Sequence, residues 1–92
     1  MGKITVNLYG VIARIAGERK TVIEANTLRE ALKILSERYG KEFSERIYEA
    51  EDKVKRFLNI YINGKDIRFL NGLETVLNEN DEVSIIPAVG GG

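Results

Sequence analysis

The stretch that decides the fold is the C-terminal sequence Glu82-Val83-Ser84-Ile85-Ile86-Pro87-Ala88-Val89-Gly90-Gly91-Gly92. Its first part is rich in β-branched apolar residues, which predicts a strand over residues 82–87. Its last part ends in three glycines, and glycine lacks the Cβ that restricts the backbone of other residues. We therefore expect one domain over residues 1–87, followed by a flexible tail, residues 88–92, that can thread a narrow slot.

The N-terminal quarter of the chain predicts a hairpin. Apolar residues alternate with other residues over residues 3–9, which is the pattern of a half-buried strand. A loop is expected over residues 10–17, and the β-branched run within residues 19–25 predicts the return strand. The pattern leaves open whether Val22 or Ile23 points inward. The inward positions of the first strand are Ile4, Val6 and Leu8.

A helix is predicted over residues 28–39. Thr27 and Glu30 form a capping box, in which the threonine hydroxyl accepts an amide proton of the first turn and the glutamate reaches back. Gly40 is the natural end of this helix. The face that we expect to pack on the sheet consists of Leu28, Ala31, Leu32, Leu35 and Tyr39.

The second half of the chain predicts another hairpin. Residues 41–56 are mixed and charged, and their structure beyond one or two helical turns stays open. Alternating apolar residues over residues 58–62 lead to Asn63-Gly64, a pair suited to a type I′ turn because both residues tolerate positive φ. A short return strand is expected at residues 67–69. The residues expected to fill the core after it are Leu73 and Leu77.

The order of these elements predicts the topology. Strands lie at both ends of the domain and the main helix lies between them, so we expect the first and last strands to pair in parallel at the centre of the sheet. The predicted fold class is therefore α+β, with one main helix packed on a mixed sheet in the β-grasp, or ubiquitin-like, arrangement.

Composition excludes several functions. The 92 residues include 14 basic and 14 acidic ones, scattered along the chain, so we expect no nucleic-acid partner. The absence of Cys and His excludes disulfides, thiol catalysis and His-based acid–base chemistry, and we expect no metal site. Because no long apolar segment occurs, we expect a cytoplasmic protein with no membrane partner.

Three large side chains are expected on the sheet face opposite the helix. If the alternating apolar residues face the helix, Tyr9, Tyr61 and Ile86 point the other way. Such a group beside the tail indicates a partner surface. Scattered exposed apolar residues are also common in proteins, and both interpretations stay open.

The Gly92 carboxylate is the remaining reactive group. A carboxylate is a poor electrophile at neutral pH, so its use as a carrier requires activation by another enzyme, such as ATP-dependent adenylation, followed by attack of a nucleophile. Gly90 and Gly91 would let the chain end enter a narrow active site in extended form. Binding of the folded body elsewhere has to offset the entropy lost on ordering them.

Several motifs give the chain a family resemblance that spans nearly its whole length. They are Ala16-Gly17, the Thr27 capping box, Asn63-Gly64-Lys65-Asp66-Ile67-Arg68-Phe69-Leu70, and Ile86-Pro87-Ala88-Val89 before the glycines. With these motifs, the chain resembles the MoaD and ThiS sulfur carriers, most closely the archaeal-type MoaD-like proteins, which also include ubiquitin-like small modifiers.

The resemblance implies that a MoeB- or ThiF-class enzyme uses ATP to adenylate Gly92, which sulfur transfer converts to a thiocarboxylate. It implies that the tail inserts into a MoaE-like large subunit and supplies sulfur for the molybdenum cofactor. The chain would then be the small subunit of molybdopterin synthase, with no bound cofactor and no catalytic side chain of its own. By position, Gly91 and Gly92 match the family's terminal pair, and Tyr9 matches an aromatic residue on the exposed side of the first strand. We expect tail access through Gly90 and Gly91. The residues expected to bind partners are Tyr9, Tyr61, Ile86, Pro87 and Val89.

Two positions depart from the family pattern: Gly90 stands where Ala or Thr is common, and Ile86 stands where some members have an aromatic residue. Three alternatives stay open. They are a modifier conjugated through Gly92 to lysines of other proteins, a ThiS-like sulfur carrier for thiamine synthesis, and a noncovalent ubiquitin-like interaction domain with inert glycines. The sulfur donor, the acceptor and the oligomeric state also stay open.

Overall fold

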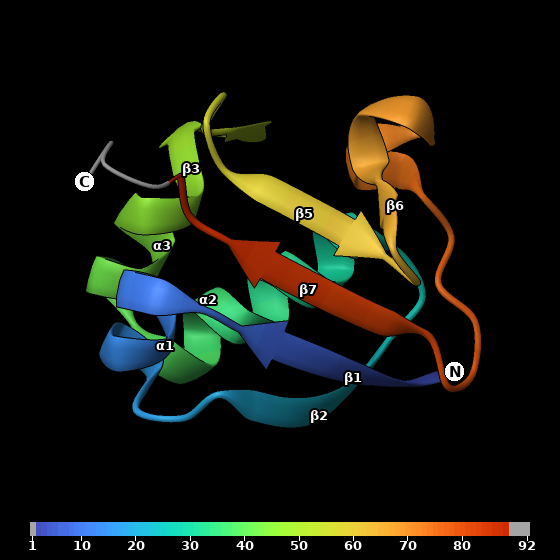
Figure 1. The fold of residues 1–92 in the computed structure, drawn as a ribbon, viewed down its shortest axis with the longest axis horizontal. Coiled ribbons are helices and arrows are strands. Elements are labelled where there is room, and N and C mark those ends of the chain that lie inside the picture. The colour runs from blue at the N-terminus through green and yellow to red at the C-terminus, as the bar shows by residue number, and fades with distance from the viewer. Residues whose placement is uncertain (1, 89–92) are drawn as a thin grey trace.

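The computed structural model describes residues 2–88, and Figure 1 shows its elements in chain order. The strands of the main sheet are β1 (Gly2–Leu8), β2 (Lys20–Ala25), β5 (Asn59–Ile62), β6 (Lys65–Asp66) and β7 (Glu82–Ile86). The helices are α1 (Gly10–Ala16), α2 (Leu28–Tyr39) and α3 (Lys41–Ile47), with short 3-10 helices η1 (Ile67–Phe69) and η2 (Gly72–Glu74). A separate small hairpin consists of β3 (Tyr48–Ala50) and β4 (Lys53–Val54).

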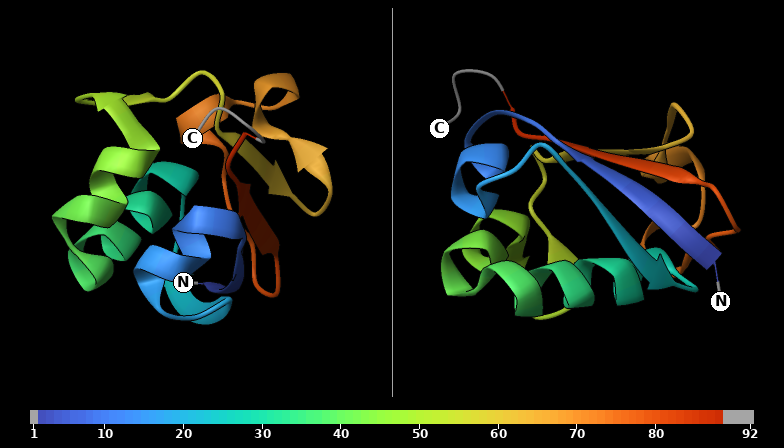
Figure 2. Two further views of the ribbon diagram at one scale, coloured as in Figure 1. Left: turned by 60° about the vertical axis from the view of Figure 1, so that its left-hand side comes forward. Right: turned by 90° about the horizontal axis from the view of Figure 1, so that it is seen from below.

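The five-stranded sheet has the strand order β2-β1-β7-β5-β6. β1 and β7 pair in parallel at its centre, as predicted, and the other neighbouring strands are antiparallel. Figure 2 shows α2 and α3 packed below one face of the sheet, whereas within residues 2–88 no helix covers the other face. The predicted β-grasp arrangement with a mixed sheet is confirmed.

α2 forms where it was predicted and begins at the capping box. The Glu30 amide donates to Oγ1 of Thr27 at 3.2 Å, and the Glu30 carboxylate accepts a hydrogen bond from the Asn26 amide at 2.8 Å. These bonds satisfy amides that a helix start otherwise leaves without partners. The fully buried residues of α2 are Leu28, Ala31, Leu32 and Leu35.

The core lies between the sheet and the helices. Ile23 points into it and is 4% exposed, whereas Val22 is 53% exposed, which settles the orientation of β2. Leu77 is buried and Leu73 packs against the core, as expected. The central strands contribute Ile4, Val6, Leu8, Val83 and Ile85. None of the helices in residues 2–88 is long and apolar enough to span a membrane.

Two predictions of local structure were wrong. Residues 10–16, expected to be a loop, form α1, because Ile12 is buried in the core and Gly17 ends the helix in the left-handed conformation with φ of 81°. The return strand expected at residues 67–69 lies at residues 65–66 instead. The Asp66 carboxylate accepts a hydrogen bond from the Arg68 amide at 2.8 Å. This hydrogen bond caps the start of the 3-10 helix η1.

Two other segments agree with the sequence. Asn63 and Gly64 both have positive φ, 52° and 86°, as a type I′ turn requires. The helical turns expected after Gly40 form α3, which buries Phe43 and Ile47. The hairpin of β3 and β4 follows directly and completes the segment that the sequence left open.

Candidate functional site

The candidate site lies where β7 ends, at the base of the predicted tail. Pro87 and Ala88 are the last residues that the structure describes. The predicted reactive Gly92 and the other tail residues, Val89, Gly90 and Gly91, lie outside the described residues 2–88. Their roles stay predictions, and the geometry concerns the surface around Pro87.

Pro87 packs against the first residue of α1. Gly10 has φ of 58°, in the left-handed region that other residues seldom adopt. A Cβ at Gly10 would lie only 2.9 Å from Cγ of Pro87. Next to this contact, the Tyr9 amide donates to the carbonyl of Ile85 at 3.2 Å. Together, these contacts fix the direction in which the chain leaves the sheet.

Tyr9, Tyr61 and Ile86, here called the outer patch, lie on the sheet face that no helix of the described residues covers. Tyr9 is 46% exposed, and the other two side chains are partly exposed. Ile86 pairs with Asn59, two residues before Tyr61 on β5, so Ile86 and Tyr61 are diagonal neighbours. The structure therefore places all three predicted residues on one face, while their binding role stays a prediction.

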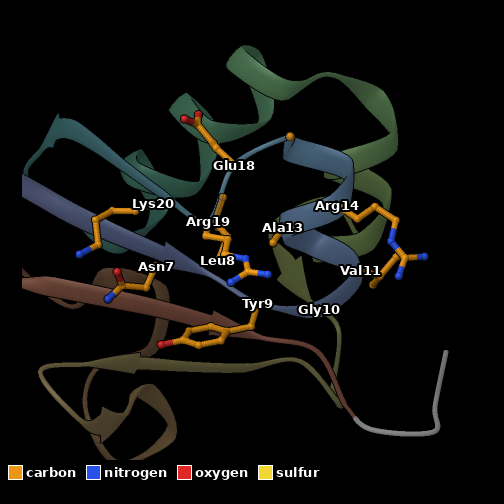
Figure 3. Close-up of a pocket in the computed structure, with 11 residues that line it drawn as sticks. Asn7, Leu8, Tyr9, Gly10, Val11, Ala13, Arg14, Glu18, Arg19 and Lys20 are labelled. Carbon is orange, nitrogen blue, oxygen red and sulfur yellow. The ribbon is translucent and has the colours of Figure 1, made fainter.

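A shallow hollow of about 800 Å³ lies beside Tyr9, between the end of β1, α1 and the start of β2 (Figure 3). Its lining is predominantly basic because it contains Arg14, Arg19 and Lys20. Glu18 also lines it, but the Glu18 carboxylate accepts a hydrogen bond from the hydroxyl of Tyr39. Because three of the four charged residues that line the hollow are basic, its net charge would attract an acidic group of a partner.

The sequence analysis missed the contribution of α1 to this site. Ile12 and Ala16 are four residues apart, which is a helical spacing, and Gly17 follows at the position of a helix-ending glycine. This signal covers only two helical turns and was interpreted as a loop. α1 contributes Val11 to a hollow that Pro87 and Ala88 also line, and Arg14 to the hollow beside Tyr9.

Two tyrosines outside the hollow beside Tyr9 have raised pKa values. The pKa values of Tyr39 and Tyr48 are raised above the ordinary 10.0, mainly because burial disfavours the charged phenolate. Neither tyrosine lines the hollow beside Tyr9. No cluster of carboxylates suited to a metal ion occurs within residues 2–88. A binding role for the surface around Pro87 stays a prediction.

Comparisons with known proteins fit this arrangement. The sequence matches the ThiS family over residues 6–92. It is 36% identical over 92 residues to the sulfur carrier protein CysO of Mycobacterium tuberculosis, and the match covers 97% of this chain and 98% of that protein.

Solved structures agree with the sequence relatives. The solution structure of the small archaeal modifier protein 1 from Methanosarcina acetivorans superposes with a TM-score of 0.90 at 32% identity, covering 100% of this chain and 98% of the other. A chain of the Amycolatopsis orientalis BexX/CysO complex superposes with a TM-score of 0.83 at 30% identity, covering 97% and 99% of the two chains. The present chain therefore belongs to the ThiS family, the ThiS/MoaD-type ubiquitin-like sulfur carriers.

Proposed function

We propose that the chain carries sulfur as a thiocarboxylate at Gly92. In the first step, a carboxylate oxygen of Gly92 attacks the α-phosphorus of ATP in a MoeB- or ThiF-class activating enzyme, and pyrophosphate leaves. In the second step, a sulfur nucleophile at the oxidation level of sulfide attacks the acyl carbon, and AMP leaves. One carboxylate oxygen departs with AMP and sulfur takes its place.

The position of β7 carries this proposal. β7 is the central strand that pairs with both β1 and β5, and it leads through Pro87 directly into residues 88–92. A chain end held this firmly at its base needs to order only a few residues when it enters an active site, so the entropic cost of insertion is small. The rigid body is then available to bind the activating enzyme.

The relatives support a function that involves a separate partner protein. CysO is a sulfur carrier protein, and a CysO protein has been crystallised in complex with BexX. For the present chain we propose that the activating enzyme binds and uses ATP, as the first step above requires.

Pyrophosphate exchange tests the adenylation step. The cognate activating enzyme should exchange labelled pyrophosphate into ATP only when the carrier is present. A chain lacking Gly91 and Gly92 should fold normally, because a terminal glycine segment buries almost nothing, and it should support no exchange. Equal exchange with the shortened and the complete chain would contradict adenylation at Gly92.

For the sulfur acceptor we propose a MoaE-like large subunit of molybdopterin synthase. The support is the sequence Ile86-Pro87-Ala88-Val89 ahead of the glycines, which resembles the tails of MoaD proteins. Thiocarboxylated chain mixed with such a subunit and a sulfur-free pterin precursor should yield a dithiolene product. A thiocarboxylate that persists, although the subunit is active with its own partner, would assign the chain to another acceptor.

Similarity to the small archaeal modifier protein 1 favours a second candidate function. In this function, the Nζ atom of a lysine on another protein attacks the acyl adenylate of Gly92, an isopeptide bond forms and AMP leaves. Cells that carry a tagged copy of the chain should then show higher-mass conjugates on immunoblots. Conjugates that remain after deletion of Gly91 and Gly92 would argue against this function.

A further inference from the structure

A second hollow, here called the Phe57 pocket, lies directly at the base of the predicted tail. Its volume is about 240 Å³, larger than the cavity of about 150 Å³ that holds benzene in another protein. A phenyl-sized side chain therefore fits into it. Its apolar lining consists of Val11, Ile12, Phe57, Leu58, Pro87 and Ala88.

Phe57 is exposed, yet the loop that carries it is held in place. Its side chain is 70% exposed, whereas the adjacent Leu58 is buried. The Leu58 amide donates to the carbonyl of Lys55 at 3.1 Å. Arg68 Nη2 donates to the carbonyls of Arg56 and Leu58 at 2.9 and 3.2 Å. An exposed aromatic ring on a fixed loop loses little entropy on binding, as an interface anchor requires.

The charge around the Phe57 pocket is positive. Arg46 and Lys55 contribute to its lining, and the Arg56 guanidinium lies 5.8 Å from the centre of the Phe57 ring. Neither Asp nor Glu is among the described residues that line the pocket. Within residues 2–88 no ion pair engages Lys55. Lys55 and Arg56 place positive charge beside this apolar pocket, which favours an acidic partner segment.

We propose that the Phe57 pocket receives one apolar side chain from an acidic surface segment of the activating enzyme. This inference rests on the proposed function, because the pocket acquires its role from the adenylation of Gly92. Ala88 lines the pocket and lies four residues before Gly92. A fully extended chain spans at most about 3.6 Å per residue, so the enzyme segment must lie within about 14 Å of the adenylation site. Docking there positions the body for insertion of the tail.

Two variants test the pocket with the complete chain and its cognate MoeB/ThiF-class enzyme. Phe57→Ala should raise the KM for the carrier about tenfold and leave kcat within about twofold of the wild-type value. The contact made by the Phe57 ring is the same in the ground state and the transition state, so its loss weakens binding without slowing the chemical step. Lys55→Glu should raise KM similarly and weaken the dependence of KM on salt.

Matched controls are available on η1 and β6, outside the lining of the Phe57 pocket. Phe69→Ala removes a phenylalanine that is 87% exposed on η1, and Lys65→Glu reverses an exposed charge on β6. Neither residue lines the Phe57 pocket, so both variants should keep the wild-type KM. Equal effects of the Phe57 and Phe69 variants, or wild-type KM for both pocket variants, would overturn the proposal.

A direct measurement of binding tests docking at the Phe57 pocket independently of the adenylation of Gly92. Isothermal titration of the enzyme, without ATP, with chains that lack Gly92 reports docking without any chemistry. If Phe57→Ala binds the enzyme more weakly than the otherwise identical chain with Phe57, the docking role of the Phe57 pocket is supported, even if the complete chain is never adenylated. Undetectable binding of the parent, or binding unchanged by Phe57→Ala, would overturn it even if thiocarboxylate forms on the wild-type chain.

Discussion

Gly10 and Pro87 are in direct contact, and this contact joins the start of α1 to the end of β7. The position that a Cβ would take on Gly10 lies 2.9 Å from Cγ of Pro87. The two residues are 77 positions apart in the sequence, yet together they set the geometry from which the tail departs. This contact relates the fold to the proposed carrier function, because the tail begins at Pro87.

Substitution of Gly10 should therefore lower the free energy of unfolding more than substitution of another glycine with positive φ. Gly10→Ala combines backbone strain with a clash against a rigid proline ring, and we expect a loss of about 2–4 kcal/mol in the free energy of unfolding. Gly17→Ala is the matched control, since Gly17 has φ of 81° and nothing within 4 Å of a Cβ, and should lose about 1 kcal/mol. Urea unfolding measures both, and equal losses would show that the Pro87 contact is unimportant.

Arg68 is expected to hold the Phe57 loop through its two hydrogen bonds to backbone carbonyls. Arg68→Ala should lower the free energy of unfolding by about 1–2 kcal/mol, because hydrogen bonds from a charged group are lost. It should also speed hydrogen exchange at the Leu58 amide, whose bond to Lys55 lies in the same loop. Unchanged exchange at Leu58 would mean that the loop is held by other contacts.

Tyr48 should make stability fall at high pH. Burial raises its pKa above 10.0 in the folded state, so the folded protein keeps the proton in a range where the unfolded chain has lost it. The contribution of protonated Tyr48 to the free energy of unfolding is fully present below about pH 10, and it is lost as the pH rises through the pKa that Tyr48 has in the folded protein. Tyr48→Phe should flatten this decline in urea unfolding measured between about pH 9 and pH 11. An identical decline in the variant would contradict the assignment.

The outer patch should contribute to partner binding without contributing much to folding. Tyr9→Ser should weaken binding of the activating enzyme about tenfold, as loss of an aromatic contact at an interface commonly does. Its melting temperature should stay near that of the wild type because Tyr9 is 46% exposed. Val22→Ser is the control on the β2 edge, 53% exposed, and should bind normally. Equal binding by both variants would remove Tyr9 from the interface.

The sequence predicted those parts of the fold that have strong periodicity. The strands around Val6, Ile60 and Ile85 and the helix that contains Leu32 bury one regular face each, so their apolar spacing is readable. α1 was missed because it has only two turns and buries Ile12 alone. A short helix of this kind is stabilised by tertiary contacts, which leave little periodic signal in the sequence.

The candidate site was predictable only in part. The common face of the outer patch followed from strand alternation, which requires no knowledge of long-range contacts. The tail stays a prediction, because residues 89–92 lie outside the described part of the chain. The Phe57 pocket was not predictable, because it is formed by four segments that are separated in the sequence: α1, α3, the loop before β5 and the residues after β7. Phe57 itself stands in a charged, irregular segment that gave no signal.

The most direct test of the central claim is the intact mass of the chain after incubation with ATP, the cognate activating enzyme and a sulfide source. We predict that the mass rises by the difference between a sulfur and an oxygen atom, and that tandem mass spectrometry places the change at Gly92. The shortened chain without Gly91 and Gly92 should keep its mass. An unchanged mass of the complete chain, with an enzyme proven active on another carrier, would contradict the account.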